Sequence, residues 1–169
     1  MTEEHKKPSA EEILIEDYRP KYREHFRALN YEWLERYFSV EPYDRIVLAD
    51  PQREVIGRGG CVLFALIGED VAGTCALIKH TERKFELAKM GVSPKFQGRG
   101  VGRRLCRAAI ARAAQLGAET LILATSPRLE AANHLYRSLG FMPVDTSEFG
   151  PLPYSRHSIV MALDLTEPE

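Results

Sequence analysis

Three alternating glycines stand among basic residues in the stretch Gln97-Gly-Arg-Gly-Val-Gly102. Glycine has no Cβ, so its backbone N–H group can approach a ligand closely. A helix that begins here adds unpaired N–H groups and the positive end of its dipole. The segment 95–112 contains no Asp or Glu and carries six cations, which are Lys95, Arg99, Arg103, Arg104, Arg107 and Arg112. This pattern predicts an anion-binding turn that suits phosphate or pyrophosphate.

Residue types exclude two common phosphate-binding motifs at this turn. No Gly-Lys-Ser/Thr is present, so the turn is not a nucleoside-triphosphate P-loop. A dinucleotide site would place an acidic residue about 20 residues further on, at the end of the next strand, whereas Thr125 and not an acid follows the strand predicted at 120–124. A diphosphate held by backbone groups, such as that of coenzyme A, fits the remaining pattern. A plain glycine turn before a solvated basic helix stays open as the alternative.

Length and charge bound the kind of protein. A chain of 169 residues is expected to form one domain, 1–169, with residues 1–11 as a flexible tail. A net charge of −1 argues against nucleic acid as the main partner. Neither a signal peptide nor an apolar run long enough for a membrane span is evident.

Cysteine and histidine usage predicts a reduced, metal-free protein. The three cysteines, Cys61, Cys75 and Cys106, are scattered, which favours a cytoplasmic setting. No His, Cys or carboxylate cluster has the spacing of a metal site, so the histidines, His80 among them, are interpreted as surface or core residues. We therefore expect no metal.

The elements that must position the glycine turn alternate between strands and helices. Hydrophobic periodicity and turn residues predict helices at 20–29, 30–38, 101–116 and 129–139, with a short one near 51–56 in an otherwise loop-rich 41–59. Strands are predicted at 13–15, 60–67, 71–78, 85–92, 120–124, 141–144 and 157–165. The order predicts an α/β protein with a mixed sheet.

The strand 85–92 alternates poorly between apolar and polar residues. Burial on both faces, with a β-bulge near Lys89–Gly91, would explain this pattern. The strand ends just before the glycine turn, which puts the turn at a carboxyl end of the sheet, where ligands bind.

Four stretches together resemble the GNAT N-acetyltransferase superfamily. They are Glu86–Val92, Gln97–Gly102, Thr120–Ala124 and Ala132–Phe141, in the order and at the spacing that the family shows. The resemblance implies a mostly antiparallel, twisted sheet of six to seven strands, splayed at the cofactor site, with about four helices. It also implies acetyl-CoA as acyl donor and an amine as acceptor, and a dimer is an expectation from the resemblance alone.

The resemblance maps cofactor contacts onto the strand, the turn and the helix after it. The residues implied are Met90, Gly91, Val92, Gln97, Gly98, Arg99, Gly100, Val101, Gly102 and Arg103. Asn133 is a further candidate, with a polar helix surface as its alternative. Ser126 stands where many relatives have an asparagine, which leaves the side-chain part of that contact open.

Glu86 and Tyr136 are the candidate catalytic residues. Glu86 opens the strand that carries the cofactor, where many relatives place an acidic base, although it could instead face solvent or pair with Arg83 or Lys84. Other acids near the acceptor region, such as Glu32, Glu35 and Asp44, stay open as alternative bases. The family often places a tyrosine at the position of Tyr136, as the acid for the leaving thiolate, and a core tyrosine is the alternative.

The acceptor site is expected outside the cofactor motifs. Trp33, Tyr37 and Tyr43 offer aromatic surface, and Arg156 could hold a carboxylate. Aromatic packing between helices and a structured proline loop explain the same residues equally well. The leading interpretation is an enzyme that acetylates a primary amine of a small molecule by direct transfer. A protein or peptide acetyltransferase and a non-catalytic acetyl-CoA-binding module remain as alternatives.

Overall fold

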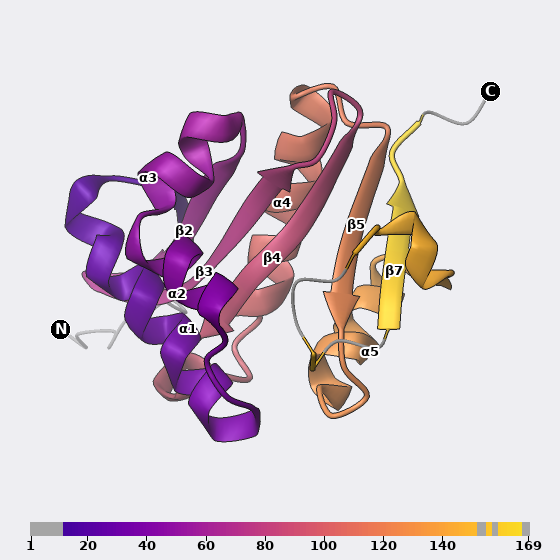
Figure 1. The fold of residues 1–169 in the computed structure, drawn as a ribbon. Coiled ribbons are helices and arrows are strands. Elements are labelled where there is room, and N and C mark those ends of the chain that lie inside the picture. The colour runs from indigo at the N-terminus through magenta and orange to yellow at the C-terminus, as the bar shows by residue number, and fades with distance from the viewer. Residues whose placement is uncertain (1–11, 152–154, 157–158, 167–169) are drawn as a thin grey trace, which may run out of the picture.

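The computed structural model describes residues 12–151, 155–156 and 159–166, and a seven-stranded sheet runs through it (Figure 1). The strand order is β1-β2-β3-β4-β5-β7-β6. Neighbours are antiparallel except β4 and β5, which are parallel. The strands are β1 (Ile13–Asp17), β2 (Cys61–Ile67), β3 (Asp70–Lys79), β4 (Lys84–Val92), β5 (Thr120–Thr125), β6 (Met142–Val144) and β7 (Ile159–Asp164).

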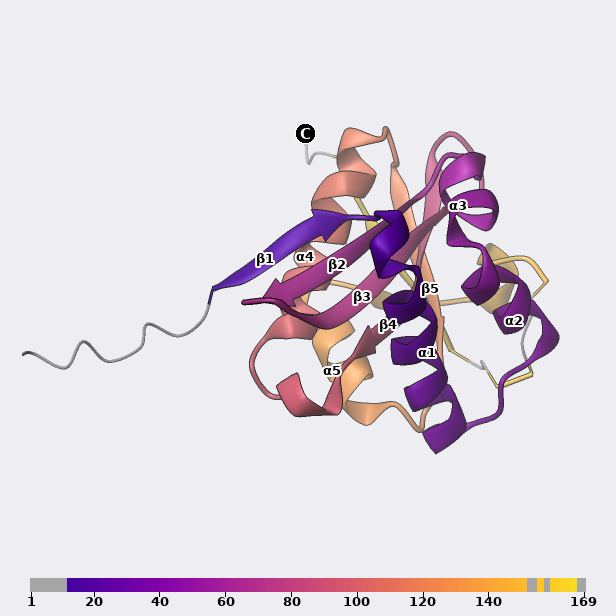
Figure 2. The same cartoon turned by 90° about the vertical axis from the view of Figure 1, so that its left-hand side faces the viewer.

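Helices cover both faces of this sheet (Figure 2). On one face lie α1 (Arg23–Tyr37), α2 (Pro42–Ala49) and α3 (Pro51–Glu54), and on the other lie α4 (Val101–Gln115) and α5 (Glu130–Ser138). Short 3₁₀ turns occupy Pro20–Tyr22, Ile56–Arg58, Pro94–Phe96 and Thr146–Glu148. None of the helices in the described part of the chain is long and apolar enough to cross a membrane.

The hairpin of β2 and β3 is apolar on both faces because two cores meet on it. Leu63 and Leu77 are buried against α4, whereas Val62 and Phe64 are buried beneath α1 and α2. Side chains alternate between the faces of a strand, so a strand buried on both sides reads as a continuous apolar run. The predicted hairpin is confirmed.

A β-bulge interrupts β4 where the sequence pattern predicts one. Ala88 pairs with Ala76 and Gly91 pairs with Thr74, so two β4 residues, Lys89 and Met90, stand opposite a single residue of β3. Lys89 has a φ of 52°, a left-handed conformation that is uncommon outside glycine. Such bulges bend a strand and re-aim its side chains.

The sheet splays immediately after the start of β4. Three residue pairs join β4 to β5, and the last of them is Glu86 with Ile122. Beyond Glu86 the two parallel strands separate, and among the strands of the described residues the remainder of β4 has β3 alone as a neighbour. The predicted splayed, mixed sheet is therefore confirmed.

The N-terminal helices differ from the prediction. The expected pair at 20–29 and 30–38 forms a single helix, α1, preceded by a 3₁₀ turn. Within 41–59, which was expected to be mostly loop, Pro42 begins α2 and the Glu41 N–H donates to Asp44 Oδ2 at 2.9 Å. This start satisfies a backbone donor through an acidic side chain, a capping signal that the prediction overlooked. The tail expected at 1–11 and the start of the last strand at 157–158 lie outside the described residues.

Candidate active site

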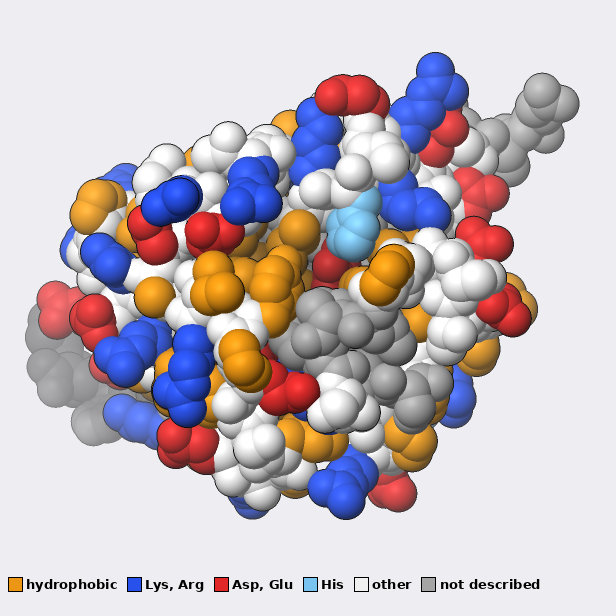
Figure 3. All heavy atoms as spheres, viewed as in Figure 1, with side chains coloured by type: hydrophobic (Ala, Val, Ile, Leu, Met, Phe, Trp, Pro, Cys, Tyr) orange, Lys and Arg blue, Asp and Glu red, His pale blue; other side chains and the backbone are white. Residues whose placement is uncertain are grey.

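A cleft of about 780 Å³ opens where β4 and β5 separate. Its walls come from β4, the glycine turn, the first residues of α4, the start of α5 and the end of α1. Figure 3 shows hydrophobic side chains with acidic groups between them near the middle of the face drawn in Figure 1. Open sheets bind ligands at such a separation of strands.

The glycine turn forms one side of this cleft. Gly98 and Gly100 have φ angles of 78° and 81°, and a Cβ built on either would meet no atom within 4 Å. Glycine is therefore required here by backbone conformation and not by crowding, since L residues avoid this region. Gly100 directly precedes α4, so the turn presents open backbone at a helix N-terminus. This arrangement fits a diphosphate such as that of coenzyme A.

Three arginines of α4 differ in where their side chains lie. Arg103 lines the cleft and donates to Ser138 Oγ at 3.1 Å. Arg104 donates to the Ile13 carbonyl at 3.2 Å, and Arg112 pairs with Asp17 at 2.7 Å. Arg104 and Arg112 thus connect α4 to β1, so part of the basic sequence pattern serves the fold and not a ligand.

Glu86 lies on the wall of the cleft at the point where the strands separate. Glu86 is 7% exposed, and Nε2 of His80 lies 2.8 Å from Oε1 of Glu86. The partners considered from sequence are engaged elsewhere, because Arg83 pairs with Glu119 and Lys84 Nζ donates to the Glu148 carbonyl. The carboxylate therefore lies in the cleft beside an imidazole.

Sequence reasoning missed this imidazole. Ile78 pairs with Glu86 across β3 and β4, and His80 stands two residues further along, on the same side of the hairpin. Diagonal neighbours of this kind can be reached by long side chains. The register of the hairpin, once recognised, would have indicated the contact.

Tyr136 projects from α5 into the cleft wall and is 9% exposed. Burial raises the pKa of Tyr136 well above its usual value, so its hydroxyl stays protonated and can donate. Its ring meets Phe141 edge-on at a centroid distance of 6.0 Å. Tyr136 is thus both a core side chain and a cleft residue.

Asn133 and Ser126 do not belong to the residues that line the cleft. Asn133 Oδ1 accepts from Thr125 Oγ1 at 2.7 Å, and its Nδ2 donates to the Ser126 carbonyl at 2.9 Å. These bonds join the end of β5 to α5. The structure places both residues in support of the cleft wall.

Trp33 and Tyr37 of α1 line the cleft together with Arg156, whose guanidinium carbon lies 5.9 Å from the centre of the Trp33 ring. Tyr43 is not among the lining residues and packs with the core cluster beneath α1 and α2. Lys89 Nζ stands 5.7 Å from the centre of the Tyr43 ring.

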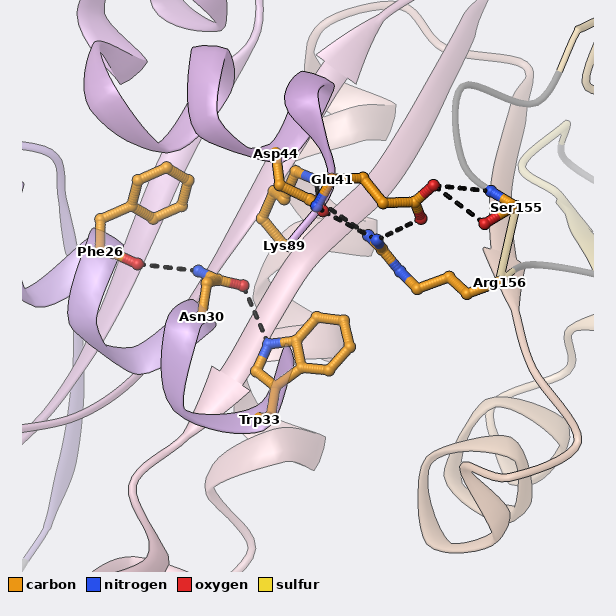
Figure 4. A network of polar contacts seen from close by, with 8 residues as sticks. All are labelled: Phe26, Asn30, Trp33, Glu41, Asp44, Lys89, Ser155 and Arg156. Carbon is orange, nitrogen blue, oxygen red and sulfur yellow. Dashed lines mark hydrogen bonds and ion pairs between the residues drawn. The ribbon is translucent and has the colours of Figure 1, made fainter. Parts of the chain in front are cut away.

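An ionic cluster joins Arg156, on the wall of the cleft, to Lys89 in the bulge of β4 (Figure 4). Asp44 Oδ1 accepts from Lys89 Nζ at 2.7 Å and from Arg156 Nη2 at 2.7 Å, while Arg156 Nη1 lies 3.0 Å from Glu41 Oε2. Burial alone would raise the pKa of Asp44, but the bonds from Arg156 and Lys89 outweigh it and lower that pKa. The cluster thus fixes the bulge with buried charges of both signs.

The cysteines are buried and poorly reactive. Burial raises the pKa of Cys106 to about 12 and that of Cys61 to about 11. The thiolate is the nucleophilic form, so these thiols are unsuited to carrying an acyl group. Within 12–151, 155–156 and 159–166, no group of three or more His, Cys, Asp or Glu could hold a metal ion.

Known proteins resemble this chain in sequence. Residues 9–141 match the model of the acetyltransferase (GNAT) family. An uncharacterized N-acetyltransferase, YvbK of Bacillus subtilis, is 32% identical over 60% of this chain and 67% of its own length. Human N-acetylaspartate synthetase is 32% identical over 56% of this chain, and the match spans only 32% of that protein.

Solved structures resemble it in fold. A GNAT-family acetyltransferase from Staphylococcus aureus Mu50 has a TM-score of 0.83 at 18% identity, covering 92% of this chain and 100% of that one. The yncA protein of Salmonella typhimurium, solved with its cofactor acetyl-CoA, has a TM-score of 0.73 at 20% identity, covering 92% and 95%. The family model matches most of this chain, and the splayed sheet and the open glycine turn agree with that match. The chain therefore belongs to the GNAT family of acetyltransferases.

Proposed function

We propose that the protein transfers an acetyl group from acetyl-CoA to a primary amine of a small molecule. The observation that carries this proposal is a single cleft with an open, left-handed glycine turn on one wall and the buried carboxylate of Glu86 on another. The first feature suits a diphosphate, and the second suits the removal of a proton from an amine.

Each of the chain's groups has a task in this reaction. Gly98, Gly100 and the first amides of α4 would hold the diphosphate, and the backbone of Met90–Val92 would run beside the arm of the ligand. When bound, acetyl-CoA supplies a thioester whose carbonyl carbon accepts the amine lone pair and whose thiolate leaves. A backbone N–H aimed at the carbonyl oxygen is worth about 3–4 kcal/mol in such acyl transfers.

Glu86 would take the proton that the amine nitrogen loses as the new C–N bond forms. At neutral pH only about one alkylamine in a thousand is unprotonated, so a nearby base is valuable. The protonated hydroxyl of Tyr136 would donate to the leaving sulfur. Direct transfer, without an acetylated cysteine, agrees with the burial and raised pKa values of Cys61 and Cys106.

The acceptor end combines the aromatic surfaces of Trp33 and Tyr37 with the cluster around Arg156. Relatives are named for acceptors of different kinds, among them a mycothiol acetyltransferase of Propionibacterium freudenreichii and the N-alpha-acetyltransferase RimI of Mycobacterium tuberculosis. The aromatic side chains of Trp33 and Tyr37 and the guanidinium of Arg156 line the cleft, and we interpret this part of it as the site of a small amine.

The test has two arms, calorimetric titration with CoA and release of free thiol from acetyl-CoA in the presence of a panel of amines. We expect binding of CoA and amine-dependent release, with Glu86→Gln lowering kcat by roughly 10²-fold or more. Glu82→Gln is the matched control, because the Glu82 side chain is 88% exposed on the same hairpin. CoA binding without release for any amine would favour a non-catalytic binding module. An absence of CoA binding would overturn the proposal altogether.

A further inference from the structure

His80 is a residue to which neither the family motifs nor the cleft lining assigns a task. It stands at the β3–β4 turn, where its N–H donates to the Lys84 carbonyl at 2.9 Å and so belongs to the closure of the hairpin. Its side chain is 27% exposed, whereas that of Glu86 is 9% exposed. The imidazole therefore lies between the buried carboxylate and solvent.

The contact between the two residues is short and directed. Nε2 of His80 lies 2.8 Å from Oε1 of Glu86, within the range of a good N–H···O hydrogen bond. Among the side-chain hydrogen bonds between described residues, this one alone reaches the Glu86 carboxylate, and Glu86 is one of the residues that line the cleft. The two lysines of the same strand have other partners, since Lys89 Nζ donates to Asp44 Oδ1 at 2.7 Å and Lys84 Nζ donates to the Glu148 carbonyl at 2.9 Å.

A second contact fixes the imidazole itself. The ring of Phe149 meets the ring of His80 edge-on, with centroids 5.4 Å apart and planes at 74°. Phe149 is 8% exposed and packs with Ile122 and Val160 of the sheet. The imidazole is thus held from one side by the sheet core and reaches the carboxylate on the other.

We propose that His80 is a positioning residue for Glu86, an inference that rests on the proposed function. The N–H at Nε2 donates to Oε1 and fixes the carboxylate, so that Oε2 faces the cleft and accepts the proton of the amine. A buried carboxylate without such a donor would be costly and free to rotate. Preorganised orientation of this kind governs how well a general base works.

Two substitutions separate this role from mere packing. His80→Gln keeps an N–H donor within reach of Oε1 but removes the ring that Phe149 contacts. His80→Phe keeps a ring against Phe149 but removes the donor. We expect His80→Phe to lower kcat at least tenfold and His80→Gln to stay within about threefold of the wild type. KM for acetyl-CoA should be unchanged in both, and His25→Gln, on an exposed histidine of α1, serves as the control.

The amine used is the one that gives the fastest thiol release in the panel. The opposite order of the two variants, or wild-type kcat in His80→Phe, would overturn the inference. Melting temperatures of both variants show whether a loss of activity follows from unfolding. An unfolded His80→Phe is replaced by His80→Leu, for which the same loss of kcat is expected.

A readout without turnover tests the same contact. In protein labelled with ¹⁵N, the imidazole shifts of His80, assigned by their absence in His80→Gln, report which ring nitrogen carries the proton. We expect the proton at Nε2 in the wild type. A neutral ring protonated at Nδ1 alone would contradict the inference even if the enzyme is active. Conversely, a protein that binds CoA but acetylates no amine would refute the proposed function while this measurement still decides the contact.

Discussion

Lys89 Nζ lies 2.7 Å from Asp44 Oδ1, and both side chains are buried, at 3% and 0% exposure. Lys89 is also the residue whose positive φ forms the bulge of β4. One ion pair therefore connects the start of α2 with the irregular point of the strand that borders the cleft.

Asp44→Asn should destabilise the fold strongly. The change leaves Lys89 and Arg156 buried beside a neutral amide, and breaking a buried pair from one side costs about 3–5 kcal/mol. Urea unfolding measures the loss. The control is Asp17→Asn, whose pair with Arg112 is far more exposed and worth about 0–1 kcal/mol. Equal losses in the two variants would contradict a buried cluster.

Acid should weaken the wild type more than the Asp44→Asn variant. The pKa of Asp44 in the folded protein lies below the usual 3.8, because the bonds from Arg156 and Lys89 outweigh the effect of burial. A carboxyl whose pKa is lowered by folding contributes its full stability at pH values above its pKa in the unfolded chain. This contribution is lost as the pH falls through its pKa in the folded protein. Unfolding free energies measured from about pH 6 down to about pH 3 should therefore fall more steeply in the wild type. Parallel curves would count against the assignment.

Gly100→Ala should weaken CoA binding at least tenfold, or by about 1.4 kcal/mol. Gly117 offers a matched control, because it also has a positive φ, 91°, with no atom within 4 Å of a built Cβ, but it lies outside the cleft lining. Both alanine variants should lose roughly 1–2 kcal/mol of stability from backbone strain. Calorimetry should show lost affinity in the first variant only, and similar affinities would argue against the glycine turn as the diphosphate site.

Tyr136→Phe should lower kcat by roughly tenfold or less, below the usual range for acid catalysis, because a thiolate leaves readily even without a proton. The phenyl ring keeps the edge contact with Phe141, so folding should be preserved. Steady-state kinetics with Tyr31→Phe as control make the comparison. A raised KM for acetyl-CoA with unchanged kcat would assign Tyr136 to binding instead.

The central part of the fold was predictable because its signals are local. The hairpin, the bulged strand, the glycine turn and α4 each depend on residues within one stretch of the sequence, and all appear as predicted. The helix α2 was missed because its start depends on a capping box of Glu41 and Asp44. Acidic residues are equally common in loops, so their presence alone does not indicate a helix start.

The site was predictable only where a single segment forms it. Glu86 and the glycine turn lie on consecutive elements, whereas the pairing of Asp44 with Arg156 spans 112 residues. No periodicity reports a contact at that separation. Likewise, Tyr43 has the aromatic character expected of an acceptor residue, yet it is half-buried on α2 against the core cluster and is not among the residues that line the cleft, a difference set by tertiary packing.

The short pairing between β4 and β5 has a consequence for stability. Three residue pairs hold the first four strands to the β5–β7–β6 unit along this seam, and the cleft continues where they end. A molecule that fills the cleft touches both portions of the sheet, so its binding free energy adds to the cohesion between them. A ligand bound in the cleft should accordingly slow amide hydrogen exchange in β5 as well as in β4, because it stabilises the contact between these two parts of the sheet.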